Sequence, residues 1–273
     1  TYNVTFAGDK RTITPQVTED DILTVGDSPL VRIAFEENDG ETASAGAAYT
    51  AGGELILKTV AKSRGLIGGG GSDEATHNLT DTLGGGKVTA LEIDRALQNL
   101  YVGTDTGRVY RYNIRNRQNP ELLETLDATG NSRIPVTALG FLLGDRSLVV
   151  GDEAGSVSVW FEVADPDSPG GKVFKKVHQL PPFALPVSEI VPSSRDRGFI
   201  ASDSGGNINL YHATSEQKLM QLKTDGPPVM NLSFAPKGNG ILAVDGAGKL
   251  YDWDVSNPHP ETSFKTLFGK VWY

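Results

Sequence analysis

The side chains that most often carry catalysis or bind metals are sparse and scattered in this sequence. None of the histidines has a second potential ligand at the spacing of a metal site; they are His77, His178, His212 and His259. Neither a G-x-S-x-G nor an H-E-x-x-H motif is present, and the absence of cysteine excludes thiolate metal sites and disulfides. We therefore expect no catalytic residue, no metal, no cofactor and no enzymatic activity.

Two stretches match known ligand-binding loops only in part. The loop at 165–171 offers oxygen ligands, but it lacks the third ligand and the bidentate glutamate of a calcium loop, so we interpret it as a solvated turn. Gly86-Lys87 resembles the end of a phosphate-binding loop. However, Asp81 stands where the first glycine belongs, and a strand rather than a helix follows. The match to a phosphate-binding loop is therefore weak.

Four arginines form a basic cluster: Arg108, Arg111, Arg115 and Arg117. Such a cluster could receive an anion or the acidic surface of a partner. A charged edge strand that prevents further strands from adding would explain the cluster equally well, and we favour this interpretation. The binding residues are therefore left unassigned.

The elements that must position these side chains come from an internal repeat. Residues 136–163 predict three antiparallel strands, VTALGF, SLVVG and SVSVWFEV, with a turn at DEAG before the last. Asp152 and Gly155 suit that turn, because glycine tolerates positive φ and a short carboxylate can accept bonds from the loop backbone. Three strands cannot bury both faces alone, so copies must stack on either side.

Four copies of this unit begin 48, 51 and 42 residues apart, close to the period of about 40–50 expected of four-stranded propeller blades. The opening residues are Val88, Val136, Val187 and Val229, and the turn glycines are Gly107, Gly155, Gly206 and Gly248. Aspartates precede these glycines at Asp105, Asp152, Asp203 and Asp245, and aliphatic residues follow at Val109, Val157, Ile208 and Leu250. An aromatic column comes last, at Tyr112, Trp160, Tyr211 and Trp253. We interpret the aspartates as turn residues and the aromatic residues as packing between neighbouring blades.

A fourth strand fits after each copy, at 120–126, 172–180, 217–223 and 263–268. We therefore predict a single all-β domain over residues 1–273, a β-propeller of about six four-stranded antiparallel blades with room for a seventh. The four regular blades are 88–127, 136–180, 187–224 and 229–268. Residues 1–28 are expected to form a partial blade that contributes two strands.

A divergent blade is expected at 30–82. Leu30, Ile33 and Phe35 match the apolar positions of the opening strand, the turn glycine comes late at Gly53, and Lys58 replaces the aromatic residue. About four residues are inserted within 39–47. Two glycine tracts, GGGGS at 68–72 and GGG at 84–86, suggest a flexible linker that carries ATHNLTDTL (75–83) as the outer strand of this blade.

Composition limits the function further. The net charge of −9 over 273 residues argues against a general nucleic-acid surface, which needs a basic face. The 32 glycines and 15 prolines suit a fold with many tight turns. The chain contains no run of 18 apolar residues and no signal peptide.

Two resemblances follow from the last repeat and the end of the chain. The Trp253-Asp254 pair that closes a strand after the turn at 245–248 resembles a WD40 blade. The ending KTLFGKVWY (265–273), directly after such blades, resembles the long bacterial phosphate ABC transporter permeases of the PstC type. In that family a large propeller-like periplasmic domain is inserted between the first transmembrane helix and the permease core.

This resemblance implies a non-catalytic periplasmic module of a bacterial inner-membrane protein, which docks partners or regulates phosphate import. Residues 269–273 would then lead toward the membrane core, although Trp272 and Tyr273 suit a closing strand as well as a membrane interface. The implied partners are the rest of the permease chain, a periplasmic phosphate-binding protein or a partner permease subunit, with membrane attachment through flanking segments. The main alternative is a free-standing WD40-like interaction scaffold, cytosolic or periplasmic; a propeller enzyme is the third. A propeller fold by itself hosts many functions.

Overall fold

The computed structural model describes residues 2–7, 10–15, 28–38, 43–62, 72–142, 144–193, 197–234 and 240–254. In these ranges the regular structure is almost entirely β-strand, with two short 3-10 helices, η2 (Thr80–Leu83) and η3 (Ala213–Ser215), and no α-helix. None of the described segments is a helix long and apolar enough to cross a bilayer.

The strands form antiparallel sheets that follow the order of the chain. Sheet 1 contains β3 (Leu30–Glu37), β4 (Ala43–Thr50), β5 (Leu55–Lys62) and β6 (Ser72–Asn78). Sheet 2 contains β7 (Val88–Ile93), β8 (Asn99–Thr104), β9 (Arg108–Asn113) and β10 (Glu121–Asp127). Sheet 3 contains β11 (Val136–Phe141), β12 (Ser147–Asp152), β13 (Val157–Ala164) and β14 (Lys172–Leu180). Sheet 4 contains β15 (Val187–Pro192), β16 (Gly198–Asp203), β17 (Asn207–His212) and β18 (Gln217–Lys223), and sheet 5 contains β19 (Val229–Phe234), β20 (Gly240–Asp245) and β21 (Leu250–Asp254).

These assignments confirm the all-β class and the four-stranded antiparallel sheets. The opening strands and the predicted fourth strands β10, β14 and β18 lie at the expected positions. The N-terminal pair is also confirmed, because β1 (Tyr2–Ala7) and β2 (Lys10–Pro15) form an antiparallel hairpin. The strand expected at 263–268 and the exit segment at 269–273 lie outside the described residues, as does most of the GGGGS tract.

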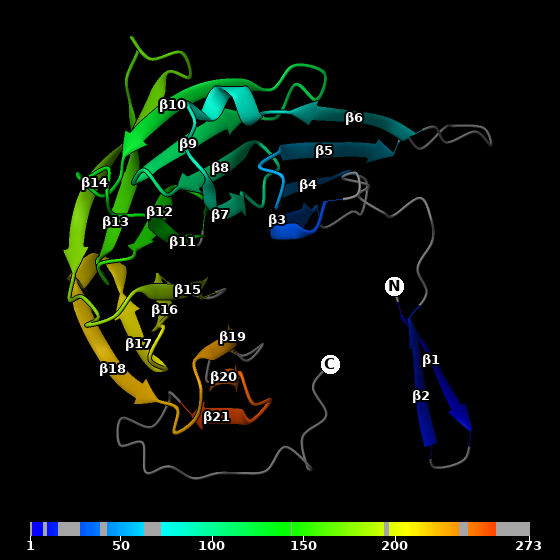
Figure 1. Cartoon of the computed structure of the whole chain (residues 1–273), viewed down its shortest axis with the longest axis vertical. Coiled ribbons are helices and arrows are strands. Elements are labelled where there is room, and N and C mark those ends of the chain that lie inside the picture. The colour runs from blue at the N-terminus through cyan, green and yellow to red at the C-terminus, as the bar shows by residue number, and fades with distance from the viewer. Residues whose placement is uncertain are drawn as a thin grey trace.

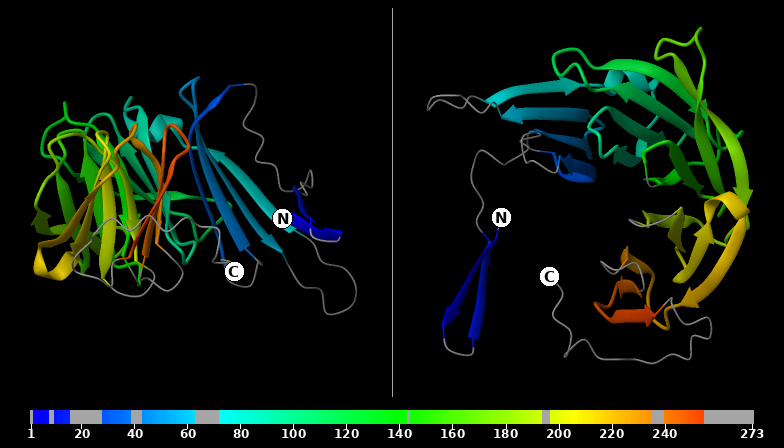
Figure 2. Two further views of the ribbon diagram at one scale, coloured as in Figure 1. Left: turned by 90° about the horizontal axis from the view of Figure 1, so that it is seen from below. Right: turned by 180° about the vertical axis from the view of Figure 1, so that it is seen from behind.

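Sheets 1 to 5 stand side by side in a curved row (Figure 1). The first strand of each sheet lies on the inner side of the curve, and the fourth strand of sheets 1 to 4 lies on the outer side (Figures 1 and 2). The inner strands contact one another in series, from β3 through β7, β11 and β15 to β19. A β-bulge follows the first residue of every inner strand, so the repeat extends to backbone detail.

The hydrophobic core lies between consecutive sheets. One apolar cluster fills each of the four interfaces, from sheets 1 and 2 to sheets 4 and 5. The aromatic column belongs to these clusters: Tyr112, Trp160, Tyr211 and Trp253 are all buried, each packed toward the preceding sheet. Their predicted packing role is confirmed, and burial of such large rings is a main source of stability.

The predicted turn residues are confirmed as well. Asp245 Oδ1 accepts hydrogen bonds from the backbone N–H groups of Ala247 and Lys249, both at 2.9 Å. The turn glycine of the same hairpin, Gly248, has φ +79°, and the late glycine of sheet 1, Gly53, has φ +89°. These are left-handed conformations that favour glycine.

The divergent sheet 1 differs from the expectation in two places. The predicted outer strand at 75–83 begins earlier, as β6, and ends at Asn78; Thr80–Leu83 forms η2 instead, closed by Gly84 in the left-handed conformation. Tyr110 Oη donates to the carbonyl of Leu83, which fixes that helical turn beneath sheet 2. The extra residues near 39–47 lengthen the strands, since β3 and β4 have eight residues where β7 and β8 have six.

The apolar side chains of β3 are exposed rather than buried. Ile33 and Phe35 are 61% and 64% exposed. Sheet 1 is the first in the row, and no other described sheet covers the face on which these side chains lie. At the replaced aromatic position, Lys58 pairs with Glu74 of β6 at 3.2 Å.

Candidate functional site

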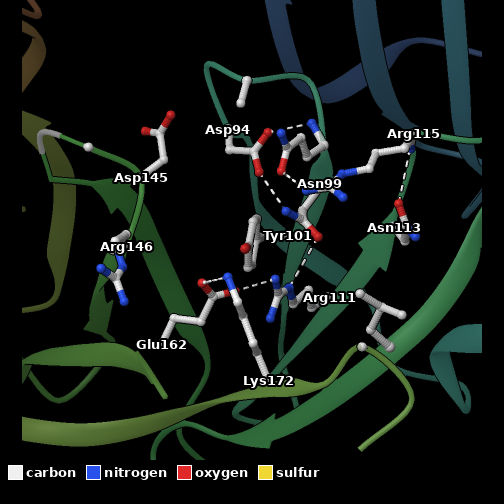
Figure 3. A pocket seen from close by; sticks show the side chains of 15 residues that line it. Asp94, Asn99, Tyr101, Arg111, Asn113, Arg115, Asp145, Arg146, Glu162 and Lys172 are labelled. Carbon is white, nitrogen blue, oxygen red and sulfur yellow. Dashed lines mark hydrogen bonds and ion pairs between the residues drawn. The ribbon is translucent and has the colours of Figure 1, made fainter. Parts of the chain in front are cut away.

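A polar hollow of about 410 Å³ opens between sheets 2 and 3, and we call it the first hollow. Its walls come from the β7–β8, β9–β10, β11–β12 and β13–β14 loops and from the adjoining parts of β8, β9, β10, β13 and β14 (Figure 3). All of these segments lie at one end of the strands, because antiparallel hairpins place the β7–β8, β11–β12 and β13–β14 connections on the same face.

A chain of charged and polar side chains forms the floor of the first hollow. Arg111 of β9 donates from Nη2 to Glu162 Oε1 of β13 at 2.7 Å, and Lys172 of β14 binds the other carboxylate oxygen at 2.9 Å. Arg111 Nε donates to Asn99 Oδ1 at 3.1 Å, and Asn99 Nδ2 donates to Asp94 Oδ2 at 2.6 Å. This network of hydrogen-bonded side chains therefore crosses from sheet 2 to sheet 3, as Figure 3 shows.

The buried guanidinium of Arg111 is the centre of this network. Arg111 is only 6% exposed, and its planar group lies over the rings of Tyr101 and Phe174, at 6.0 and 5.2 Å from their centroids. Its Nη1 has no hydrogen-bond partner among the described residues and lies 4.0 Å from Glu124 Oε2. A buried cation of this kind is tolerated because it has an ionic partner and aromatic faces around it.

The pKa values of the two glutamates near Arg111 are shifted in opposite directions. Burial raises the pKa of Glu124 above its usual value, although a bond from the Phe174 backbone and the charge of Arg111 oppose the shift. Burial also acts to raise the pKa of Glu162, but the hydrogen bonds and charges of Lys172 and Arg111 outweigh it and hold that pKa below the usual range. Glu162 is therefore ionised at neutral pH as the fixed partner of Arg111.

Asp94 and Asp145 come from the two loops of the first hollow. Asp94 Oδ1 accepts a hydrogen bond from the backbone N–H of Gln98 at 2.6 Å, which closes the β7–β8 loop. Burial, together with the nearby charge of Asp94, raises the pKa of Asp145. On β7, burial and the charges of Glu36 and Asp145 raise the pKa of Glu92 to about 8.

The lining of the first hollow consists mainly of charged and polar side chains. The ionised groups of the floor neutralise one another, and no nucleophile lies beside a general base there. In the part of the chain that the structure describes, no group of three or more His, Asp or Glu side chains could hold a metal ion. The hollow can offer hydrogen bonds and a mixed-charge surface to a ligand or a partner.

The predicted basic cluster is divided between different places, and its interpretation as a charged edge is wrong for Arg108 and Arg111. Both lie on β9, which pairs with β8 on one side and β10 on the other and is therefore no edge strand. Arg111 and Arg115 line the first hollow, with Arg115 bonded to the Gln98 side chain. Arg117 lies elsewhere, where its carbonyl accepts a hydrogen bond from His77 Nε2 at 2.6 Å.

The other sequence candidates have local roles. The 165–171 loop is a turn, in which the Asp165 carboxylate accepts a bond from the backbone of Asp167. His178 pairs with Glu216 at 2.6 Å, and His212 lies beside the Ser215 hydroxyl. His259 is outside the described residues.

Sequence reasoning missed Asp94, Asn99, Glu162 and Lys172. A signal for one of them was present, because Glu162 occupies a repeat position that holds the buried Ile114 and Ala213 in the neighbouring copies. The signal at Arg111 is weaker, because its position holds Val159 and Leu210 in the next two copies but Asp252 in the fourth. A charge at a repeat position that is otherwise apolar is a marker of such a buried pair.

A second hollow, of about 320 Å³, opens one interface further along, between sheets 3 and 4. It shares Gly144 and Arg146 with the first hollow, so the two adjoin on the same face.

Comparisons with known proteins give partial similarities. No protein-family model matches the chain. A stretch of 88 residues, 31% of the chain, is 33% identical to cytoplasmic dynein 2 intermediate chain 1 of Mus musculus and spans 9% of that protein's length. The crystal structure of the computationally designed Ika4 protein has 21% sequence identity and a TM-score of 0.48, over 63% of this chain and 92% of that chain.

Proposed function

We propose that this chain is a non-catalytic docking module that holds a partner protein against the face bearing the two hollows. The observation that carries the proposal is the pair of adjoining hollows, which open between consecutive sheets at the same end of the strands. Rigid strands position these loops, and loops on a rigid scaffold are where binding proteins commonly place their contacts. The partial similarity to a dynein intermediate chain, by its name one chain of a larger assembly, is in keeping with this role.

The docking module is proposed to be a WD40-like β-propeller of about six blades, with room for a seventh. Three features support this arrangement: the curved row of sheets, the contact of consecutive inner strands, and the bulge that recurs in every inner strand. Electron microscopy of the protein would count the blades. A row that remains open between β3 and β21 would contradict the propeller.

Site-specific crosslinking tests the docking role. A photoreactive amino acid is placed at Ala96 in the first hollow or at Thr214 in the second; both positions are exposed. The matched control is Glu153, an exposed residue of the β12–β13 turn at the opposite end of the strands. We expect the same discrete crosslinked partner from both hollow positions in the native cell, and none from Glu153. Equal labelling from all three positions, or none, would contradict the proposal.

For the parent protein, we propose the periplasmic domain of a phosphate permease of the PstC type, in the bacterial inner membrane. The support is the string at 265–273, which lies outside the described residues. Sequencing the gene on both sides of the segment is the decisive measurement. One hydrophobic span upstream and several downstream would support the permease, whereas a stop codon soon after Tyr273 with no upstream span would favour the free-standing scaffold.

A further inference from the structure

The second hollow differs from the first in its charges. Its lining contains no aspartate or glutamate, but it includes Arg146, Arg197 and His178. The first hollow contains Asp94, Asp145 and Glu162 beside its cations. The second hollow therefore has two guanidinium groups and no carboxylate in its lining, in a chain with a net charge of −9.

The two arginines of the second hollow come from different sheets. Arg146 directly precedes β12 of sheet 3, and Arg197 directly precedes β16 of sheet 4, at equivalent places in two consecutive repeats. Neither side chain has an ion-pair partner among the residues that the structure describes. Arg146 lies over the ring of Phe161, 5.3 Å from its centroid, which holds the guanidinium at the wall of the hollow.

Two described carboxylates beside lining residues of this hollow have other partners. Glu216 is bound by His178 Nδ1 at 2.6 Å. The carboxylate of Asp145 accepts hydrogen bonds from the backbone of Arg95 and Ala96, on the side of the first hollow. Among the described residues, neither carboxylate forms an ion pair with Arg146 or Arg197.

Apolar side chains form the rest of the lining. Leu142 and Val159 are buried, Phe161 is half-buried, and Val177 is 44% exposed. Aromatic residues and arginine are both enriched in protein interfaces, so the contact of Arg146 with Phe161 suits a recognition site.

We propose that the second hollow binds a peptide segment of a partner protein in which an aromatic or branched aliphatic residue adjoins a carboxylate. The apolar side chain lies against Val159, Phe161 and Val177, and the carboxylate lies between Arg146 and Arg197. The inference rests on the proposed docking function and names the chemistry of the partner. The overall negative charge of the chain weakens the attraction only modestly, since charges beyond about 8 Å are screened at physiological ionic strength.

The proposal is tested with two blocked dipeptides, N-acetyl-Phe-Glu-amide and N-acetyl-Phe-Gln-amide. They differ only in whether the second side chain is a carboxylate or an amide. We expect the Glu peptide to shift the amide NMR signals of Val177 and Thr214 with an affinity in the millimolar range, as about −4 kcal/mol of binding free energy implies. The Gln peptide should bind about tenfold more weakly or worse, because each hydrogen bond to a charged group contributes that much. Equal binding of the two peptides would overturn the proposal.

Variants then locate the site. The double substitution Arg146→Gln and Arg197→Gln should reduce Glu-peptide binding by about tenfold or more, and raised salt should reduce it as well. The control is Arg133→Gln, at an exposed arginine in the β10–β11 loop, which should leave binding unchanged. An equal loss of Glu-peptide binding in the control variant would overturn the assignment of the peptide to the second hollow. If partner crosslinks at Thr214 survive while neither peptide binds, docking stands and the acidic-peptide inference falls.

Discussion

Arg111 on β9 and Glu162 on β13 are 51 residues apart in the sequence, and their side chains meet at 2.7 Å across the interface between two sheets. Both residues are more than nine-tenths buried. The pair therefore links two successive repeats. Removing either residue would leave the charge of the other buried without this partner, which destabilises the fold.

Substituting Arg111 by methionine should destabilise the protein strongly. Glu162 would keep only Lys172 as its partner, and Asn99 would lose a hydrogen bond, so we expect a loss of about 3–5 kcal/mol in the free energy of unfolding. Urea denaturation followed by tryptophan fluorescence measures the loss. The control Arg133→Met, at an exposed position, should change stability by no more than about 0.5 kcal/mol.

The double substitution Arg111→Met and Glu162→Leu separates charge from packing. Because replacing both members of a buried pair by apolar residues is often neutral, the double variant should be more stable than Arg111→Met alone. A double variant that is no more stable than the single one would show that packing around the guanidinium, rather than the unpaired charge of Glu162, causes the loss.

The stability contribution of Glu92 should depend on pH. Its folded-state pKa of about 8 lies above the value of 4.5 expected in the unfolded chain, so the folded state binds the extra proton between these values. Wild-type stability should therefore fall as pH rises from about 4.5 to about 8. Glu92→Gln, which mimics the protonated acid, should raise the melting temperature at pH 9 and change it little at pH 4.5. The exposed Glu153→Gln serves as the control, and an equal effect of Glu92→Gln at both pH values would contradict the burial of this carboxyl group.

Two turn glycines at equivalent positions should respond differently to alanine. Gly155 and Gly248 have φ values of +82° and +79°, so each alanine substitution should cost about 1–2 kcal/mol in backbone strain. A Cβ at Gly155 would also lie 2.5 Å from the carbonyl oxygen of Phe183, whereas a Cβ at Gly248 meets nothing within 4 Å. We expect Gly155→Ala to lose about 1–3 kcal/mol more than Gly248→Ala in thermal or urea unfolding. Equal losses would mean that the 181–186 segment moves away without cost.

The hydroxyl hydrogen bonds of Tyr211, a residue of the aromatic column, can be tested against Tyr101, a buried tyrosine outside the column. Tyr211 Oη donates to the carbonyl of Pro181 at 2.7 Å and accepts from Asn209 Nδ2 at 2.8 Å. Tyr211→Phe leaves both groups unpaired and should cost about 1–3 kcal/mol. Tyr101 is equally buried, but its hydroxyl makes no hydrogen bond to the described residues, so Tyr101→Phe should cost much less. Similar losses in the two variants would show that the hydroxyl bonds of Tyr211 contribute nothing.

The sequence alone determined the features that depend on neighbouring residues in the chain. Alternating apolar residues placed the strands of sheets 2 to 4, and the aspartate and glycine columns placed their turns, because strand faces and tight turns are governed by local sequence. The aromatic column identified the core between sheets because every copy of the repeat has the same neighbour to pack against.

Only the tertiary structure decided which charges meet and which apolar residues stay exposed. The contact of Arg111 with Glu162 depends on how β9 faces β13 across the interface of two sheets. A repeat identifies equivalent positions in different copies, but it does not show which positions touch across such an interface. Ile33 and Phe35 have the pattern of a buried strand, yet they are exposed because sheet 1 is the first in the row. Arg146 and Arg197, which have no ion-pair partner among the described residues, lie 51 residues apart in the sequence. They line one hollow only because sheets 3 and 4 stack against each other.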